Sequence, residues 1–271
     1  MATIAANLCR RLEGKVAVIT GGASGIGEAT VGLFTKHGAK VIVADISKKA
    51  GQSFSPDATY IHCDVSKEED VSAAVDLAME KHGKLDIMFN NAGIVETKSR
   101  KAMEYDMEEF QRVLSVNING VMHGIKHAGR VMVPRKNGCI ISTASVGGLL
   151  GGLSPYGYTA SKHAVIGLTK QGAAEMGRYG IRVNCVSPAA LATDITLRFF
   201  GKSSWEEFCT KAEWEASLKK IANLKSHILE TQDIAEAALY LASEESKFVS
   251  GHNLVVDGGS TVVNHDLSIY Q

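Results

Sequence analysis

Short apolar runs alternate with longer amphipathic segments along most of the chain. The runs are rich in valine and isoleucine and are apolar on both faces, which is typical of buried strands in a parallel sheet. We predict strands at Lys15–Thr20, Lys40–Asp45, Thr59–Cys63, Leu85–Asn90, Gly138–Ser142, Arg182–Ser187 and Asn253–Asp257. We predict helices at Ile26–His37, Glu68–Lys81, Glu108–Val133, Thr159–Arg178 and Gln232–Ala242. This alternation predicts an α/β fold, with a doubly wound parallel sheet of about seven strands and helices on both faces.

One region breaks the alternation. More than forty residues separate the strand that ends at Ser187 from the helix near Gln232. They include both tryptophans of the chain and three phenylalanines, namely Phe199, Phe200, Trp205, Phe208 and Trp214. Disordered segments are poor in aromatic residues, and long loops in compact folds are often functional lids. We therefore predict a folded flap at about residues 194–226, within a single domain that spans residues 1–271.

Composition and charge exclude several classes of function. The 271 residues are 45% hydrophobic and 21% charged, which fits a globular protein with a full core. Because 29 basic residues balance 29 acidic ones without a basic stripe, no nucleic-acid partner is expected. Five scattered cysteines without a CxxC pair favour a reducing, cytoplasmic setting and no metal site. No apolar run approaches the length of a membrane span or of a signal-peptide core, so no membrane association is expected.

A glycine-rich turn, "TGGASGIG", directly follows the first predicted strand. Glycine permits a sharp turn and a close approach of the backbone to a pyrophosphate, and the next helix points its N-terminal amides at the phosphates. Between a buried strand and an amphipathic helix, this turn favours dinucleotide binding over a purely structural role. The candidate cofactor-binding residues of the turn are Gly21, Ser24, Gly25, Ile26 and Gly27.

A carboxylate at the end of the second strand indicates which dinucleotide is bound. Asp45 can accept hydrogen bonds from the adenosine ribose hydroxyls, and it would repel a 2′-phosphate, so NAD is favoured over NADP. It can also cap the next helix, a role compatible with the first. Ile46 follows it, and Asp64 and Val65, after the third strand, are candidates to flank the adenine, although a plain loop explains those two almost as well. The segment after Asp45 is short, so we expect its helix to have one or two turns.

Further motifs occur in order along the chain: "NNAG" at Asn90–Gly93, "STAS" before "YTASK", and "VNCVSP" at Val183–Pro188. With the glycine turn, they resemble the short-chain dehydrogenase/reductase family, NAD(P)-dependent oxidoreductases with one Rossmann-type domain. The resemblance covers about residues 13–261 and implies four catalytic residues. These are Asn117, Ser145, Tyr158 and Lys162. Ser145 lies thirteen residues before Tyr158, the usual spacing in the family, which selects it over Ser142.

The chemistry of the tyrosine and lysine also follows from their spacing. Tyr158 and Lys162 are four residues apart on a predicted helix, so both can point into one cleft. A phenol with a pKa near 10 is a poor base at neutral pH, but a neighbouring ammonium lowers that pKa. Tyr158 can then take the hydroxyl proton of an alcohol while hydride leaves for nicotinamide C4. Ser145 can hold the substrate oxygen.

The resemblance assigns further roles around this pair. Lys162 would bind the nicotinamide ribose, and Asn117 would bend its helix and hold a water that relays protons to the lysine. Without the resemblance, Asn117 is an ordinary helix residue. The remaining cofactor-binding candidates are Asn91, Ala92, Gly93, Pro188, Leu191 and Thr193. The family usually has glycine after the proline, whereas this chain has Ala189, a departure from the family pattern just before Leu191 and Thr193.

"YTASKHAVIGLTK", "GIRVNCVSP" and "ESKFVSGHNLVVDGG" resemble most closely the plant secondary-metabolism branch of the family. That branch includes borneol, secoisolariciresinol, isopiperitenol and xanthoxin dehydrogenases and zerumbone synthase. It implies NAD-dependent oxidation of a bulky apolar secondary alcohol, with a cyclic monoterpenoid alcohol such as borneol as the first expectation. A lignan or sesquiterpenoid alcohol dehydrogenase, an NADPH-dependent ketone reductase and a non-catalytic NAD-binding scaffold are the alternatives. Small residues on the two long helices lead us to expect a homotetramer.

Overall fold

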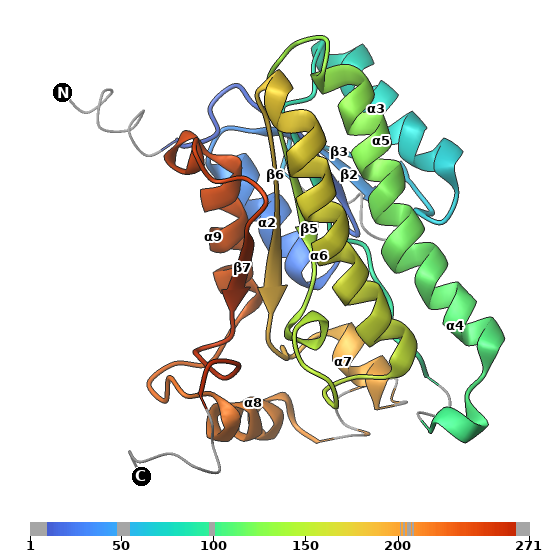
Figure 1. Cartoon of the computed structure of the whole chain (residues 1–271). Coiled ribbons are helices and arrows are strands. Elements are labelled where there is room, and N and C mark those ends of the chain that lie inside the picture. Colours follow the sequence, from blue (N-terminus) through green and yellow to red (C-terminus); the bar gives the residue numbers. More distant parts are fainter. Residues whose placement is uncertain are drawn as a thin grey trace.

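The computed structural model describes residues 10–47, 55–97, 101–200, 202, 204, 207 and 209–263 (Figure 1). Its strands are β1 (Val16–Thr20), β2 (Lys40–Asp45), β3 (Ala58–His62), β4 (Ile87–Asn90), β5 (Gly138–Thr143), β6 (Ile181–Pro188) and β7 (Asn253–Val256). They form one seven-stranded sheet in the order β3-β2-β1-β4-β5-β6-β7, and every pair is parallel. The predicted doubly wound sheet is therefore confirmed. The single-domain organisation stays a prediction.

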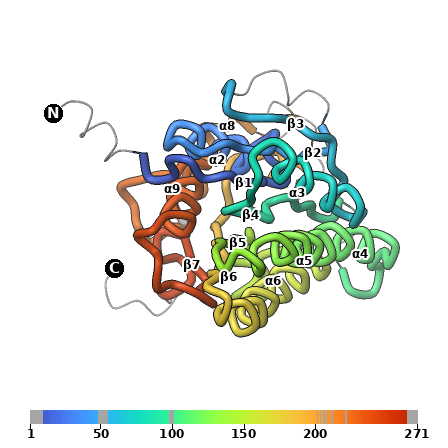
Figure 2. The backbone as a smooth tube through the Cα atoms, turned by 90° about the horizontal axis from the view of Figure 1, so that it is seen from above, coloured from blue at the N-terminus to red at the C-terminus, as the bar shows by residue number. Residues whose placement is uncertain are grey.

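Helices cover both faces of the sheet, as the view along the molecule shows (Figure 2). One face carries α2 (Gly25–Lys36) and α9 (Thr231–Ala242), and the other carries α3 (Glu68–His82), α5 (Gly120–Met132) and α6 (Tyr156–Met176). Side chains of a strand alternate between the two faces. In β2, Val41 and Val43 belong to the core on the α2 side, whereas Ile42 and Ala44 belong to the core on the α3 side. This double burial explains why the strands are apolar throughout.

The long helix predicted at Glu108–Val133 is divided in the structure. It consists of α4 (Met107–Leu114), a π-helical turn (Ser115–Asn119) and α5. The other predicted helices are confirmed, and α6 begins three residues earlier than predicted, at Tyr156. Short 3₁₀ turns lie at Ala102–Glu104, Val146–Gly148, Gly177–Tyr179 and Glu244–Ser246. The short helix expected after Asp45 falls on residues 48–54, outside the described residues.

The predicted flap contains two helices, α7 (Asp194–Phe199) and α8 (Lys211–Ile221). Both lie at the end of the molecule where the strands finish (Figure 1). At this edge β1 and β4 are neighbours, but the chain continues from them in opposite directions across the sheet. Ligands of such sheets bind in the crevice at this switch point. None of the helices in the described ranges is long and apolar enough to cross a membrane.

Candidate active site

The turn after β1 has a backbone that only glycine can provide at three positions. Gly21 and Gly25 have φ angles of +61° and +53°, in the left-handed region. A Cβ atom on Gly21 would lie 2.8 Å from Cα of Ala92, and one on Gly27 would lie 2.0 Å from the carbonyl oxygen of Gly21. Ser24, at the N-cap of α2, makes no side-chain capping hydrogen bond and is exposed. The turn therefore leaves the N-terminus of α2 open, which fits a dinucleotide phosphate.

Asp45 is held against this turn from the end of β2. Its Oδ2 accepts a hydrogen bond from the backbone N of Ala23 at 2.9 Å, and its Oδ1 accepts one from the backbone N of Ser47 at 2.8 Å. The side chain is buried, while the next residue, Ile46, is 63% exposed. The predicted carboxylate thus stands beside the glycine turn, and its second bond is that of a cap for the following segment. A carboxylate has about four acceptor positions, so these two bonds leave room for ribose hydroxyls.

Thr20, which the sequence analysis did not single out, organises the turn. Its Oγ1 accepts hydrogen bonds from the backbone N of Asn91 at 3.0 Å and of Ala92 at 3.1 Å. The side-chain Nδ2 of Asn91 donates to the carbonyl oxygens of Thr20 at 3.1 Å and Gly21 at 3.2 Å. Its Oδ1 accepts a hydrogen bond from Oγ1 of Thr143 at 3.1 Å. The "NNAG" segment therefore fixes the glycine turn. The sequence signal that could have identified Thr20 is a hydroxyl residue at the end of a buried strand, directly before the glycines.

The structure brings Ser145, Tyr158 and Lys162 together beyond the end of β5. Ser145 is the N-cap of the Val146–Gly148 turn, and Tyr158 and Lys162 lie on the first two turns of α6. The Lys162 ammonium lies 5.4 Å from the centre of the Tyr158 ring, and its Nζ donates to the carbonyl oxygen of Thr143 at 2.7 Å. Ser142, the other serine nearby, is fully buried in β5. The spacing argument thus selected the serine that stands beside the tyrosine.

Burial dominates the pKa of both members of this pair. Burial raises the pKa of the Tyr158 phenol, a hydrogen bond with Ser145 lowers it, and the charge of Glu96 raises it again. Burial also lowers the pKa of Lys162 to about 8. Burial is the largest cause in both cases, and the expected effect of the Lys162 ammonium on the tyrosine stays a prediction.

Asn117 lies in the π-helical turn and is fully buried. Its Oδ1 accepts from the backbone N of Ile94, and its Nδ2 donates to the carbonyl oxygen of Ile94, both at 2.9 Å. Nδ2 also lies 3.0 Å from Oγ of Ser161. Gly93 fits closely beside it, because an added Cβ would lie 3.4 Å from Asn117 Oδ1 and 3.5 Å from Lys162 Nζ. The asparagine therefore joins the loop after β4 to α6 at the candidate site.

The residues predicted near the nicotinamide follow β6, which ends at Pro188. Leu191 is buried, and the Thr193 methyl group would lie 3.6 Å from a Cβ on Gly25, so this segment passes close to the glycine turn. Ala189 donates its backbone N to the carbonyl oxygen of Val256 at 3.1 Å. Lys136 is the only non-glycine residue with positive φ among the described residues. Alanine in place of the usual glycine at position 189 thus fits without backbone strain.

The two residues predicted beside the adenine, Asp64 and Val65, make contacts with other residues of the chain. Oδ1 of Asp64 accepts from the backbone N of Ser66 at 3.1 Å and from its hydroxyl at 2.7 Å. Val65 is buried, and a Cβ on Gly120 would lie 2.7 Å from its side chain. Its carbonyl oxygen contacts Nδ1 of His123 at 2.9 Å. These contacts agree with the alternative of a structural loop, and for Val65 they favour packing against α5.

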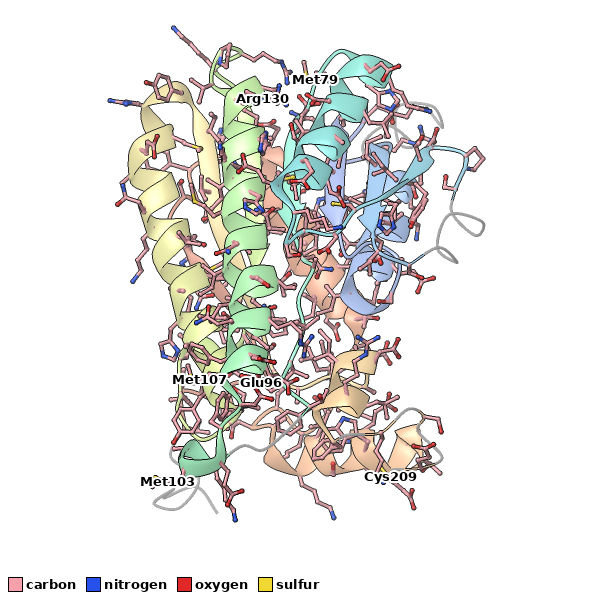
Figure 3. All side chains as sticks on the ribbon, turned by 90° about the vertical axis from the view of Figure 1, so that its right-hand side faces the viewer. Met79, Glu96, Met103, Met107, Arg130 and Cys209 are labelled. Carbon is pink, nitrogen blue, oxygen red and sulfur yellow. The ribbon has the colours of Figure 1, made fainter. Side chains whose placement is uncertain are left out.

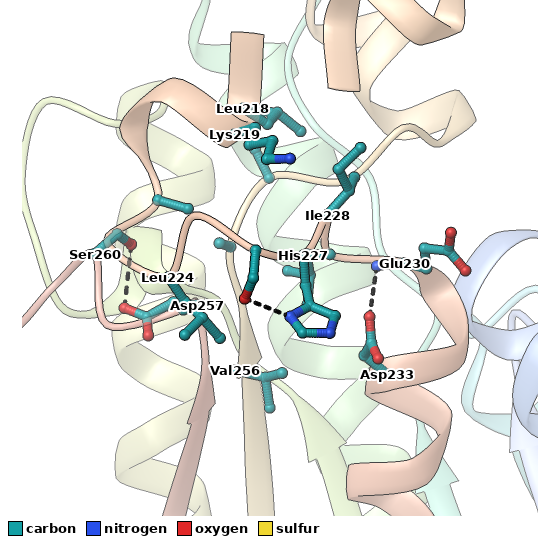
Figure 4. Close-up of a pocket in the computed structure, with 16 residues that line it drawn as sticks. Leu218, Lys219, Leu224, His227, Ile228, Glu230, Asp233, Val256, Asp257 and Ser260 are labelled. Atoms are coloured by element: carbon teal, nitrogen blue, oxygen red, sulfur yellow. Dashed lines mark hydrogen bonds between the residues drawn. The ribbon is translucent and has the colours of Figure 1, made fainter. Parts of the chain in front are cut away.

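A cavity of about 670 Å³ lies between the flap and the ends of β6 and β7 (Figure 4). Leu218 of α8, Leu224, Ala189 and Val256 line it, and His227, which contacts the Ser226 hydroxyl at 2.7 Å, faces it. None of the four candidate catalytic residues is part of its lining. The cavity therefore lies beside the flap and apart from the candidate catalytic residues.

A Rossmann-type sheet, a glycine turn open at a helix N-terminus and a serine–tyrosine–lysine group define a nicotinamide-dependent oxidoreductase. A family model described as enoyl-(acyl carrier protein) reductase matches residues 21–261. Zerumbone synthase of Zingiber zerumbet, secoisolariciresinol dehydrogenase of Forsythia intermedia and a mitochondrial borneol dehydrogenase of Lavandula x intermedia are each 49% identical to the chain. These alignments cover 96, 97 and 98% of this chain and 100, 95 and 98% of the relatives, respectively.

Among solved structures, levodione reductase matches with a TM-score of 0.83 at 33% identity, covering 93% of this chain and 100% of that chain. The chain belongs to the short-chain dehydrogenase/reductase family. It is an alcohol dehydrogenase/reductase that uses a nicotinamide cofactor, and the family resemblance read from its motifs is confirmed.

Proposed function

We propose that the protein oxidises a bulky, apolar secondary alcohol to a ketone with NAD, and that a cyclic monoterpenoid alcohol such as borneol is the leading substrate class. The observation that carries the proposal is the group of Ser145, Tyr158 and Lys162, followed in the chain by a leucine-rich loop. Leu149, Leu150 and Leu153, in the loop that joins Ser145 to α6, are 38, 41 and 51% exposed. Exposed leucines in the segment that leads from Ser145 to Tyr158 suit a hydrocarbon skeleton.

The proposal gives each side chain of this group a role. Tyr158 accepts the hydroxyl proton of the alcohol as the hydride leaves the carbinol carbon. Ser145, which shares a hydrogen bond with the phenol, holds the substrate oxygen. Lys162 binds the nicotinamide ribose, and Asn117 holds the helix turn beside it. A bound oxidised nicotinamide supplies the hydride acceptor and a positive charge that favours the phenolate.

The preference for NAD rests on Asp45. Its buried carboxylate stands beside the glycine turn, and the turn itself contains no arginine or lysine to pair with a 2′-phosphate. Placing a phosphate beside this carboxylate should cost a few kcal/mol, so NAD should be preferred by about a hundredfold or more. Equal catalytic efficiency with NADP would refute this preference and would favour the alternative of an NADPH-dependent ketone reductase.

The names of the relatives support the class of substrate more than the substrate itself. Relatives that are 49% identical are named for borneol, for zerumbone and for secoisolariciresinol. A lignan or sesquiterpenoid alcohol therefore remains the second candidate. An apolar pocket holds a ring system at about 0.8 kcal/mol per buried methylene but discriminates weakly between similar hydrocarbons. We expect activity with several bulky cyclic alcohols and little with ethanol.

The test is a screen of the purified protein with NAD against borneol, a lignan, a steroid alcohol and ethanol, with NADH absorbance as the readout. The bicyclic terpenol should have the highest catalytic efficiency. A higher efficiency for a small polar alcohol would overturn the apolar-substrate proposal. An absence of turnover with every alcohol would favour a non-catalytic NAD-binding scaffold.

We further propose a homotetramer in the cytoplasm. Small residues such as Ala164 and Ala173 on α6 permit close packing across a two-fold axis, whereas Gly120 is already buried against Val65 within the chain. Phe248, between α9 and β7, is fully exposed, which supports a second contact surface there. Light scattering at micromolar concentration that finds only monomer would exclude the tetramer. The location stays a prediction, since one relative is named as mitochondrial.

A further inference from the structure

Glu96 is a buried carboxylate next to the candidate catalytic tyrosine, in the loop that follows β4. Only 1% of its surface is exposed. Its Oε1 accepts a hydrogen bond from the backbone N of Tyr158 at 2.9 Å and another from the hydroxyl of Tyr105. Oε2 is buried and has no hydrogen-bond partner among the described residues. Figure 3 places Glu96 near Met107, at the end of the molecule that also holds the flap residue Cys209.

These contacts explain how α6 begins. Pro155 occupies its N-cap position and makes no side-chain capping hydrogen bond, so the first amides of the helix need acceptors from elsewhere. The Tyr105 hydroxyl accepts from the backbone N of Gly157 at 3.0 Å, and Glu96 accepts from that of Tyr158. A Cβ on Gly157 would lie only 2.3 Å from Oε1 of Glu96, so glycine is needed for this approach. A distant loop therefore supplies the cap.

We propose that Glu96 is a positioning residue, which caps α6 together with Tyr105 and so fixes the place of the Tyr158 phenol relative to Ser145. The proposal rests on the function proposed above, in which Tyr158 is the base. The capped amide belongs to Tyr158 itself, so a change in this bond moves the backbone that carries the phenol. Misplacement by about 1 Å in such a site can cost roughly a hundredfold in rate.

The negative charge of Glu96 also affects the pKa of Tyr158. The groups that face the Tyr158 phenol are Ser145 from the turn after β5, Lys162 from α6 and Glu96 from the loop after β4. The carboxylate raises the pKa of Tyr158, although less than burial does. Burial and then the hydrogen bond with Glu96 also raise the pKa of Tyr105, so Tyr105 stays a hydroxyl donor. Removal of the charge alone should therefore ease the deprotonation of Tyr158.

The experiment separates the hydrogen bond from the charge. Glu96→Gln keeps an acceptor oxygen and removes the charge, whereas Glu96→Ala removes both. Glu108→Gln, at an exposed carboxylate on α4, is the matched control. For each variant we would measure the melting temperature, the KM for NAD and the pH profile of kcat/KM for the best alcohol of the screen.

Glu96→Gln should melt near the wild-type temperature and should move the acid limb of the pH profile to lower pH. Glu96→Ala should melt lower and lose roughly tenfold or more in kcat, with little change in the KM for NAD. If Glu96→Ala does not fold, Tyr105→Phe, which leaves the Gly157 amide without its acceptor, should lower kcat in the same direction. Profiles, rates and melting temperatures identical to those of Glu108→Gln would overturn the proposal.

Failure of the proposed function would give a different result. A wild-type protein without turnover would refute that function, while the difference in melting temperature between Glu96→Ala and Glu96→Gln would still report the cap. An equal melting temperature for these two variants and the control would exclude the cap whatever the activity.

Discussion

The turn after β1 and the flap after β6 lie at the same edge of the sheet but are held in place in different ways. In the turn, backbone groups and the side chains of Thr20, Asp45 and Asn91 bind one another, and a Cβ at Gly27 would meet a carbonyl oxygen at 2.0 Å. The flap is held by a backbone hydrogen bond from N of Leu224 to the carbonyl oxygen of Gly258 at 2.8 Å and by aromatic packing, and a cavity of about 670 Å³ lies beside it. Close approach of backbone atoms thus shapes the proposed cofactor end, whereas packing of aromatic side chains shapes the proposed substrate end.

Within the flap, a helix cap and aromatic contacts between residues close in sequence stabilise the two helices. Thr210 and Glu213 form a reciprocal capping box at the start of α8. Phe200 stacks edge to face on Phe199 and on Trp214, with ring centres 4.8 and 5.2 Å apart, which couples α7 to α8. These contacts agree with the expectation that some of the aromatic residues form a small core within the flap. Trp205 and Phe208 lie outside the described residues.

The largest effect should come from Tyr158, the proposed base. Tyr158→Phe should remove at least about 99% of turnover, a loss of about 2.7 kcal/mol in transition-state stabilisation. It should leave NAD affinity and the melting temperature near the wild-type values, because only one hydroxyl is lost. Steady-state kinetics and cofactor titration would check it. Retention of more than about a tenth of the rate would exclude Tyr158 as the base.

The cofactor end could be predicted from the sequence because its geometry demands particular residue types. Gly21, Gly25 and Asp45 occupy positions where few other residues fit, so their spacing carries the information. The cap formed by Glu96 and Tyr105 could not be predicted, because it joins segments distant in sequence without a fixed spacing. The burial that raises the pKa of Tyr158 could not be predicted either, because it depends on packing that no short motif records.

The substrate end was predicted only in outline. Its aromatic content indicated a folded flap, and the structure places α7 and α8 there. The break in the long helix at Asn117 was implied by the family resemblance and not by helix propensity, because a single asparagine is a common helix residue. Side-chain packing, which no short motif records, decides what such a pocket accepts.

A matched pair of glycine substitutions tests the rigidity of the cofactor end. Gly27→Ala should lower the free energy of unfolding by about 3 kcal/mol and weaken NAD binding, because its methyl group collides with backbone. Gly32→Ala, in the same helix with no atom within 4 Å of the added Cβ, should raise the free energy of unfolding by up to about 1 kcal/mol. Chemical denaturation and calorimetry measure both. Equal responses would show that the turn tolerates side chains.

Loss of an aromatic contact tests the substrate end. Phe200→Ala should uncouple α7 from α8 and lower the free energy of unfolding by about 1–2 kcal/mol, since the ring is only half-buried. The KM for an apolar alcohol should rise severalfold while NAD affinity stays unchanged. Kinetics with saturating NAD would measure the first, and fluorescence titration the second. A parallel loss of NAD affinity would mean that the two ends are not independent.

The smallest effect concerns the buried lysine and depends on pH. Burial lowers the pKa of Lys162 from 10.5 to about 8, so the folded chain binds this proton less readily than the unfolded chain does. Stability is therefore lost as pH falls from 10.5 to about 8, and the loss is complete below that.

Lys162→Met removes this dependence of stability on pH. Its advantage over the wild type should be about 1–2 kcal/mol at pH 7, because the lost bond to Thr143 offsets part of the gain. The advantage should shrink as pH rises toward 10.5. Denaturant titrations across this range, with Lys36→Met at an exposed helix end as the control for loss of a lysine, decide it. An advantage that stays constant with pH would mean that the lysine is as well solvated in the fold as in water, which would contradict its burial.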